Sequence, residues 1–270
     1  MTLFPLDDSD DFRPTAPEGP SVRVRLTVAY DGSGFHGFAA TPGVRTVAGV
    51  LGDALTRVVG AAVTLSCAGR TDKGVHGRGQ VVSFDVPASF DDLARLQRSV
   101  NSMCAPAVVV RDAAFVGDDF DARHSAVSRS YRYTVVNTPV PDPLLAGRVW
   151  WVDDDLDLAA MRLGCDPLIG EHDFTSLCRV PRGVASFTMV RRVLDARWVD
   201  LGDGLLRFDI TSTSFCQQMV RSIVGLLVDV GRGRARAGDV AAILRARDRS
   251  LVRTVAPPDG LVLWEVGYPG

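Results

Sequence analysis

Apolar and polar residues alternate along residues 22–30 with the period of two that is typical of a strand. An apolar stripe with helical spacing follows over residues 47–58, and Thr46 before it is a suitable N-cap. The same patterns predict further strands at residues 62–68, 81–86 and 108–116 and a further helix at residues 90–103. The predicted order is β-α-β-β-α-β, which is the ferredoxin-like unit.

Both patterns return after residue 130. A strand is predicted over residues 131–136 and a helix over residues 158–163. The remaining predicted elements are strands at residues 192–199, 205–211 and 261–268 and helices at residues 215–230 and 237–246. Gly202-Asp203-Gly204 predicts a hairpin turn between two of these strands. We therefore predict an α+β fold of two ferredoxin-like (RRM-like) subdomains, residues 21–118 and 119–270, with their sheets side by side and a catalytic cleft between them.

The first twenty residues differ from the rest of the chain. They contain five acidic residues, one arginine and several prolines, so we expect a disordered tail with a charge of −4. The whole chain of 270 residues has a formal charge of −2, which leaves about +2 for the folded body. Any contact with RNA must therefore depend on local groups of arginines rather than on bulk charge.

Five scattered cysteines and four dispersed histidines show neither a C-x-x-C pair nor metal-ligand spacing. This predicts a reduced, cytoplasmic protein without a metal. The N-terminus lacks the basic and apolar regions of a signal peptide, and no apolar run is long enough to cross a membrane.

The segment from Gly69 to Gln80 combines several glycines with many charged groups. It places the carboxylate of Asp72 among four basic residues, namely Arg70, Lys73, His76 and Arg78. Such surroundings would keep Asp72 ionised and offer several donors to an anionic substrate. Two plainer interpretations stay open. Asp72 could bond only the amides of its own turn, and His76 is more easily explained as a hydrogen-bonding loop residue than as a general base.

Arg221 lies in the predicted helix 215–230, which is apolar around most of its circumference and should be buried. A buried guanidinium needs a partner, because an unpaired charge away from water is very costly. The partner could be Asp209 or Asp229, the head group could reach the surface, or the partner could be Asp72.

Tyr131 and Tyr133 point to one face of their predicted strand and Arg132 to the other. Packing in the core explains such a face most simply, and a platform for stacked bases is the alternative. Arg123, just upstream, could reach a phosphate. The glycine-rich run 31–38 lacks the spacing of either common nucleotide-binding motif, so nucleotide hydrolysis and dinucleotide binding are discarded.

Several ordered motifs resemble the tRNA pseudouridine synthase A family. The catalytic loop of that family resembles Gly69-Arg70-Thr71-Asp72-Lys73-Gly74-Val75-His76. The other matching stretches are residues 30–37, 45–47, 121–126 with 129–133, 170–176, 218–225 and 256–261. Two stretches depart from the pattern. Phe38-Ala39-Ala40 stands where a Trp and polar residues are usual, and Asp121 and His124 replace a His and a Phe.

The resemblance implies isomerisation of uridine to pseudouridine in the anticodon stem-loop of tRNA, by a homodimer that needs no cofactor. It makes Asp72 the essential carboxylate, Tyr131 the residue that packs on the target base and Arg221 the partner of the carboxylate. Arg70 would help to displace the base, and Lys73, His76 and Arg123 would contact the substrate. A non-catalytic RNA-binding protein and a hydrolase with Asp72 as nucleophile are the competing hypotheses.

Overall fold

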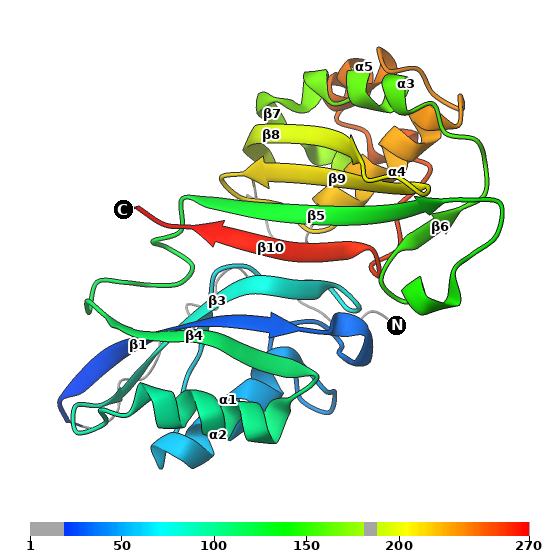
Figure 1. The fold of residues 1–270 in the computed structure, drawn as a ribbon. Helices are drawn as coiled ribbons and strands as arrows, with labels where there is room; N and C mark the ends of the chain where they lie inside the picture. Colours follow the sequence, from blue (N-terminus) through cyan, green and yellow to red (C-terminus); the bar gives the residue numbers. More distant parts are fainter. Residues whose placement is uncertain (1–18, 181–187, 270) are drawn as a thin grey trace. The chain divides into compact units, whose positions relative to one another are not determined.

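A computed structural model describes residues 19–180 and 188–269 (Figure 1). The described chain forms two compact units. The first unit contains the residues up to 129 together with those from 262 onward, and the second contains residues 130–261. Nearly all of the predicted acidic tail lies outside the described residues.

The first unit has the predicted β-α-β-β-α-β order. Its elements are β1 (Ser21–Tyr30), α1 (Val47–Val59), β2 (Ser66–Cys67), β3 (His76–Pro87), α2 (Leu93–Cys104) and β4 (Val108–Val116). Strand β1 lies between β4 and β3, antiparallel to both, and β2 pairs with β3. This is the strand order of a ferredoxin-like sheet and confirms that prediction. Strand β10 (Leu261–Gly267) adds to this sheet, parallel to the start of β3.

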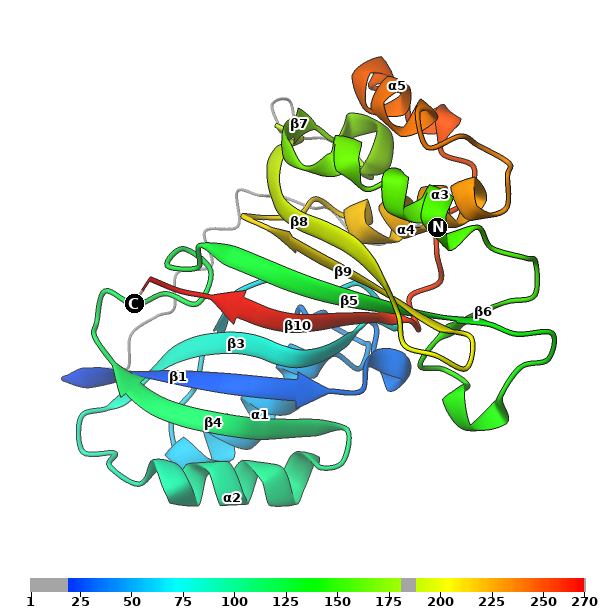
Figure 2. The same ribbon diagram turned by 45° about the horizontal axis from the view of Figure 1, so that its top comes forward.

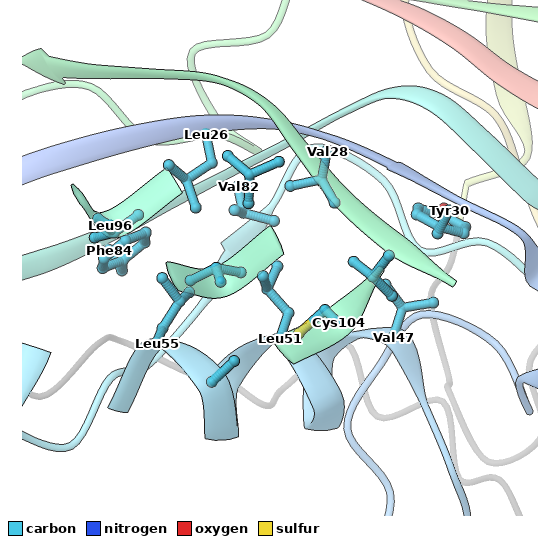
Figure 3. Packing of buried hydrophobic residues seen from close by; sticks show 14 of the residues in the cluster. Leu26, Val28, Tyr30, Val47, Leu51, Leu55, Val82, Phe84, Leu96 and Cys104 are labelled. Carbon is cyan, nitrogen blue, oxygen red and sulfur yellow. The ribbon is translucent and has the colours of Figure 1, made fainter. Parts of the chain in front are cut away.

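The core of the first unit lies between its sheet and helices α1 and α2, which cover the same face of the sheet (Figures 1 and 2). Alternate residues of β1 are buried, as the period of two predicted. Figure 3 shows buried side chains that both layers contribute, among them Leu26, Val82, Phe84, Leu51 and Leu96. Helix α1 begins at its predicted cap, because Thr46 Oγ1 accepts a hydrogen bond from the Gly49 amide.

The second unit is also a mixed α/β structure. Its elements are β5 (Ser128–Asn137, whose first two residues belong to the first unit), β6 (Trp150–Val152), α3 (Leu158–Leu163), β7 (Gly170–Asp173), β8 (Val190–Asp200), β9 (Leu205–Ser212), α4 (Met219–Gly231) and α5 (Asp239–Ala246). The sheet order is β5-β9-β8-β7, with β6 parallel to β5. The hairpin turn at Gly202-Asp203-Gly204 is confirmed, and all three residues have positive φ. The sequence patterns missed the short strands β6 and β7.

Several predicted boundaries were wrong, and three of them have a clear structural reason. Strand β2 is only Ser66–Cys67, since its pairing with β3 is limited to these residues. Strand β3 starts at His76 instead of Val81, because β1 and β10 already pair with its first residues. Helix α4 starts only at Met219, because Gln218 before it has the left-handed φ of +63°. No helix among the described residues is long and apolar enough to span a membrane.

Candidate functional site

Asp72 lies in a tight turn between β2 and β3. We call residues 69–75 the Asp72 loop. The Val75 amide donates a hydrogen bond of 3.1 Å to the Asp72 carbonyl, and Gly74 between them has a φ of +81°. Asp72 is half-buried, whereas its neighbours Arg70 and Lys73 are exposed. The sequence motif therefore forms a closed turn with two cations at its surface.

The loop after β1, residues 31–38, packs against the Asp72 loop and holds its backbone in place. The Phe38 amide donates to the Thr71 carbonyl (3.1 Å), and the hydroxyl groups of Tyr30 and Thr71 lie 2.8 Å apart. A Cβ atom on Gly32 would overlap the Val75 carbonyl, and one on Gly37 would lie 2.9 Å from the Thr71 carbonyl oxygen. Residues 31–38, which resemble a phosphate loop only weakly, thus have a structural role. Their glycines were the only sequence signal for it.

His76 is buried beside this supporting loop. Its Nδ1 lies 3.1 Å from the Gly32 amide nitrogen and 3.1 Å from Asp31 Oδ1. The Gly32 amide donates to Nδ1. Asp31 Oδ1 also accepts hydrogen bonds from the amide and the hydroxyl of Ser33. The hydrogen-bonding role expected for His76 is confirmed, and its contact with substrate stays a prediction.

The glycines and the arginine at the start of β3 serve packing within the first unit. A Cβ atom on Gly77 would lie 2.5 Å from the Tyr30 ring, and one on Gly79 would overlap the Trp264 carbonyl. Arg78 places its guanidinium 4.2 Å from the centre of the Trp264 ring, a cation–π arrangement. Close packing of neighbouring strands therefore explains these two glycines.

The segment that carries Arg123 is a capped turn. Asp121 Oδ1 accepts hydrogen bonds from the amides of Arg123 and His124, both 2.8 Å long. Ser125 Oγ accepts from the Asp121 amide (3.0 Å). Burial raises the pKa of Asp121, but the hydrogen bonds from His124, Ser66 and Arg123 outweigh it and lower the pKa below its usual value. Asp121, one of the departures from the family pattern, thus fixes the backbone beneath the exposed Arg123.

Arg70 and Arg123 both act on the thiol of Cys67. Burial raises the pKa of Cys67 to about 11, and the positive charges of the two arginines oppose that rise. Both guanidinium groups therefore lie within electrostatic reach of the end of β2. The fold thus brings these two predicted substrate-binding residues to the same part of the first unit, although 53 positions separate them in the sequence.

The two tyrosines of β5 are both buried. Tyr133 is 0% exposed, donates from its hydroxyl to the Pro257 carbonyl (2.8 Å) and packs edge-on against Trp150. Tyr131 is 8% exposed and packs edge-on against Phe215, with ring centres 5.0 Å apart. The core interpretation is therefore confirmed for Tyr133. For Tyr131, contact with a base stays a prediction.

Arg221 is the one residue of α4 that is not fully buried. Its Nε donates to the Ala256 carbonyl (2.7 Å), and the Ala256 amide donates to the Arg221 carbonyl (3.0 Å). These two bonds fix both the backbone and the head group. The buried, apolar helix expected around Arg221 is confirmed.

The two acidic residues considered as partners of Arg221 within its own unit bind other arginines. Asp209 pairs with Arg207 (2.8 Å) and Arg132 (3.3 Å). Asp229 lies 3.9 Å from both Arg232 and Arg234. Asp72 belongs to the first unit and Arg221 to the second, so their pairing stays a prediction.

Comparison with known proteins identifies the family. A family model described as tRNA pseudouridine synthase matches residues 165–269. A protein of Chromobacterium violaceum is 43% identical over 251 residues, which cover 92% of this chain and 94% of that protein. Relatives from Rhodopseudomonas palustris (43%, 91% and 99%) and Leifsonia xyli (38%, 92% and 92%) match as fully. All three are named tRNA pseudouridine synthase A. The chain belongs to the tRNA pseudouridine synthase A family.

Proposed function

We propose that this protein isomerises uridine to pseudouridine in the anticodon stem-loop of tRNA, with Asp72 as the essential carboxylate. Family membership over more than nine-tenths of the chain carries the proposal for the reaction and for tRNA as substrate. The Asp72 loop, held in a fixed shape by residues 31–38, supports the choice of the carboxylate.

The reaction moves one bond of the nucleotide. The bond from ribose C1′ to N1 of the base breaks, a bond from C1′ to C5 forms, N1 gains a proton and the proton on C5 leaves to solvent. Substrate and product have the same atoms, so no redox cofactor is required. The uridine must leave the base stack to turn over in a pocket, and a rigid loop can hold an ionised carboxylate against it.

The other predicted residues take supporting roles in this proposal. Tyr131 packs on the target base, and Arg221 pairs with the Asp72 carboxylate and keeps it ionised. Arg221 suits this role because its Nε is occupied by the Ala256 carbonyl, which fixes the direction of the remaining donors. Arg70, Lys73 and Arg123 are exposed and offer positive charge to the RNA backbone.

We further propose that the enzyme acts as a homodimer in the cytoplasm. A second protomer would enlarge the surface that holds the body of the tRNA, which suits a protein whose net charge is only −2. All five cysteines are free thiols, which is consistent with a reducing compartment.

Release of tritium from tRNA transcripts that carry tritium at uridine C5 tests the proposal directly. We expect release from wild type, loss of release with Asp72→Asn and a strong reduction with Arg221→Ala. Asp53→Asn is the matched control, because it makes the same change on the exposed side of α1 in the same unit and should retain full activity.

Two results would contradict different parts of the proposal. If wild type releases no tritium from any uridine of the anticodon arm, the proposed reaction is wrong. If Asp72→Asn releases tritium at the wild-type rate, the reaction stands and the assignment of Asp72 is wrong.

A further inference from the structure

Two side chains from β3 and β5 hold the backbone where it enters the Asp72 loop. The Ala68 carbonyl accepts hydrogen bonds from Arg129 Nε (3.1 Å) and Arg129 Nη2 (2.9 Å). The next carbonyl, that of Gly69, accepts from Gln80 Nε2 (2.6 Å). Two successive peptide groups are thus fixed immediately before Arg70, and Asp72 follows two residues later.

Gln80 is completely buried and has a defined orientation. Its Oε1 accepts a hydrogen bond from the Val81 amide (3.2 Å), so its amide nitrogen points to Gly69. Both polar atoms of the side chain are therefore used between β3 and the Asp72 loop. A buried amide that is satisfied in this way resists rotation, since any other orientation would leave a polar atom without a partner.

The Arg129 guanidinium also binds the segment that carries Arg123. Nη1 donates to the Ala126 carbonyl (3.1 Å), and Nη2 donates to the Arg123 carbonyl (2.8 Å). One planar group thus joins three carbonyls from two segments that are far apart in the sequence. Arginine suits this task because its five donors are held in one plane, whereas a lysine ammonium has three donors on a single atom.

We infer that Arg129 is a positioning residue for the isomerisation. It holds the Asp72 loop and the turn that carries Arg123 in a fixed position relative to each other, and Gln80 is a second anchor of the loop. This inference rests on the proposed function, because it assumes that Asp72 acts on the nucleotide and that Arg123 contacts the RNA. In this role Arg129 acts through the backbone of Ala68, Arg123 and Ala126 and not on the reacting atoms.

A positioning role predicts a particular division between rate and binding. A displacement of a catalytic group by about 1 Å can lower a rate about 100-fold. Binding of tRNA is spread over many phosphate contacts and should change much less when one turn shifts. Loss of Arg129 should therefore lower kcat far more than it weakens tRNA binding.

Arg129→Lys tests this division, because it keeps the positive charge and removes the planar set of donors. In single-turnover tritium release we expect a rate reduced about tenfold or more, with a Kd for tRNA within about threefold of wild type. Backbone amides of residues 69–75 and 121–126 should exchange hydrogen faster than in wild type, and the core strand β1 should not. Arg98→Lys, on the exposed face of α2, is the matched control and should match wild type in each measurement.

Four other results are possible, and each has a stated consequence for the inference. A wild-type rate with unchanged exchange in Arg129→Lys overturns it, and so does faster exchange throughout the unit, which would indicate a general loss of stability. If Arg129→Lys does not fold, Arg129→Gln takes its place, because its amide can still donate to one carbonyl. If wild type itself releases no tritium, the proposed function fails, and the exchange comparison still decides whether Arg129 anchors both segments.

Discussion

Gly32 packs directly against the backbone of the Asp72 loop. No other residue type fits there, because any Cβ atom would overlap the Val75 carbonyl oxygen. Its amide also donates to His76, so the same position supports the loop in two ways. A glycine that the shape of the Asp72 loop requires thus lies outside the motif that contains Asp72.

Gly32→Ala should therefore displace the Asp72 loop. We expect a loss of about 1–3 kcal/mol in the free energy of unfolding, because the clash is with backbone that cannot turn away. Tritium release should fall together with stability. Denaturant unfolding and the tritium assay measure the two effects.

Gly52→Ala provides the contrast within the same unit. Gly52 lies in α1, where a Cβ atom would make an ordinary contact of 4.0 Å with Leu65 Cδ1. Alanine should stabilise the helix there by about 0.5–1 kcal/mol. Equal stability of the two variants would show that the contact between Gly32 and Val75 does not constrain the loop.

At the scale of elements, the turn at residues 121–125 shows how the fold accommodates a residue that departs from the family pattern. Asp121 replaces the usual histidine, and its carboxylate caps the turn through two backbone amides. A negative charge at this position by itself weakens the attraction for phosphate. The Asp121 carboxylate is hydrogen-bonded to backbone amides of its own turn. The Arg123 side chain remains exposed.

The lowered pKa of Asp121 makes a prediction about pH. Because the folded state favours the ionised carboxylate, its contribution to stability is fully present above about pH 4, the ordinary range of an aspartate, and is lost as the pH falls through the lower folded pKa. Asp121→Asn should thus melt at a lower temperature than wild type at pH 7, and the difference should shrink toward pH 3. Thermal unfolding across this range measures it.

Asp118→Asn is the control for this experiment, since Asp118 is an exposed residue of the preceding loop and its removal changes the net charge equally. A difference between Asp121→Asn and wild type that is constant with pH would mean that the charge of Asp121 contributes nothing.

Helix α4 and strand β3 show what sequence periodicity can and cannot locate. The apolar residues of α4 correctly predicted a buried helix, but not its first turn, because Gln218 adopts a left-handed conformation that no pattern signals. Strand β3 extends into the motif because β1 and β10 supply its pairing partners. Both boundaries depend on contacts outside the segment itself.

At the scale of the whole molecule, the proposed catalytic residues are divided between two compact units. Asp72 belongs to the first, and Tyr131 and Arg221 to the second. The C-terminal strand β10 joins the first unit from Val262 onward, so the chain leaves that unit and returns to it. The second unit is therefore covalently connected to the first unit at both of its ends.

The proposed homodimer can be measured on the intact chain. One protomer has a mass of 29.0 kDa, so sedimentation equilibrium should give about twice that value in the micromolar range if the interface is of ordinary size. A monomeric protein standard of known mass, treated identically, controls for non-ideal behaviour. A species of 29 kDa at every concentration would refute the dimer and leave the proposed reaction untouched.

The sequence by itself determined the class of the fold, most of its elements, the family and the place of Asp72 in a loop between two strands. These follow from local periodicity and from short motifs, which need only neighbours along the chain. Only the tertiary structure decided why the glycines around Asp72 are needed, what His76 bonds and that Arg129 and Gln80 hold the start of the loop. These properties depend on backbone groups brought together from distant segments, and hydrogen bonds of that kind leave no periodic trace in the sequence.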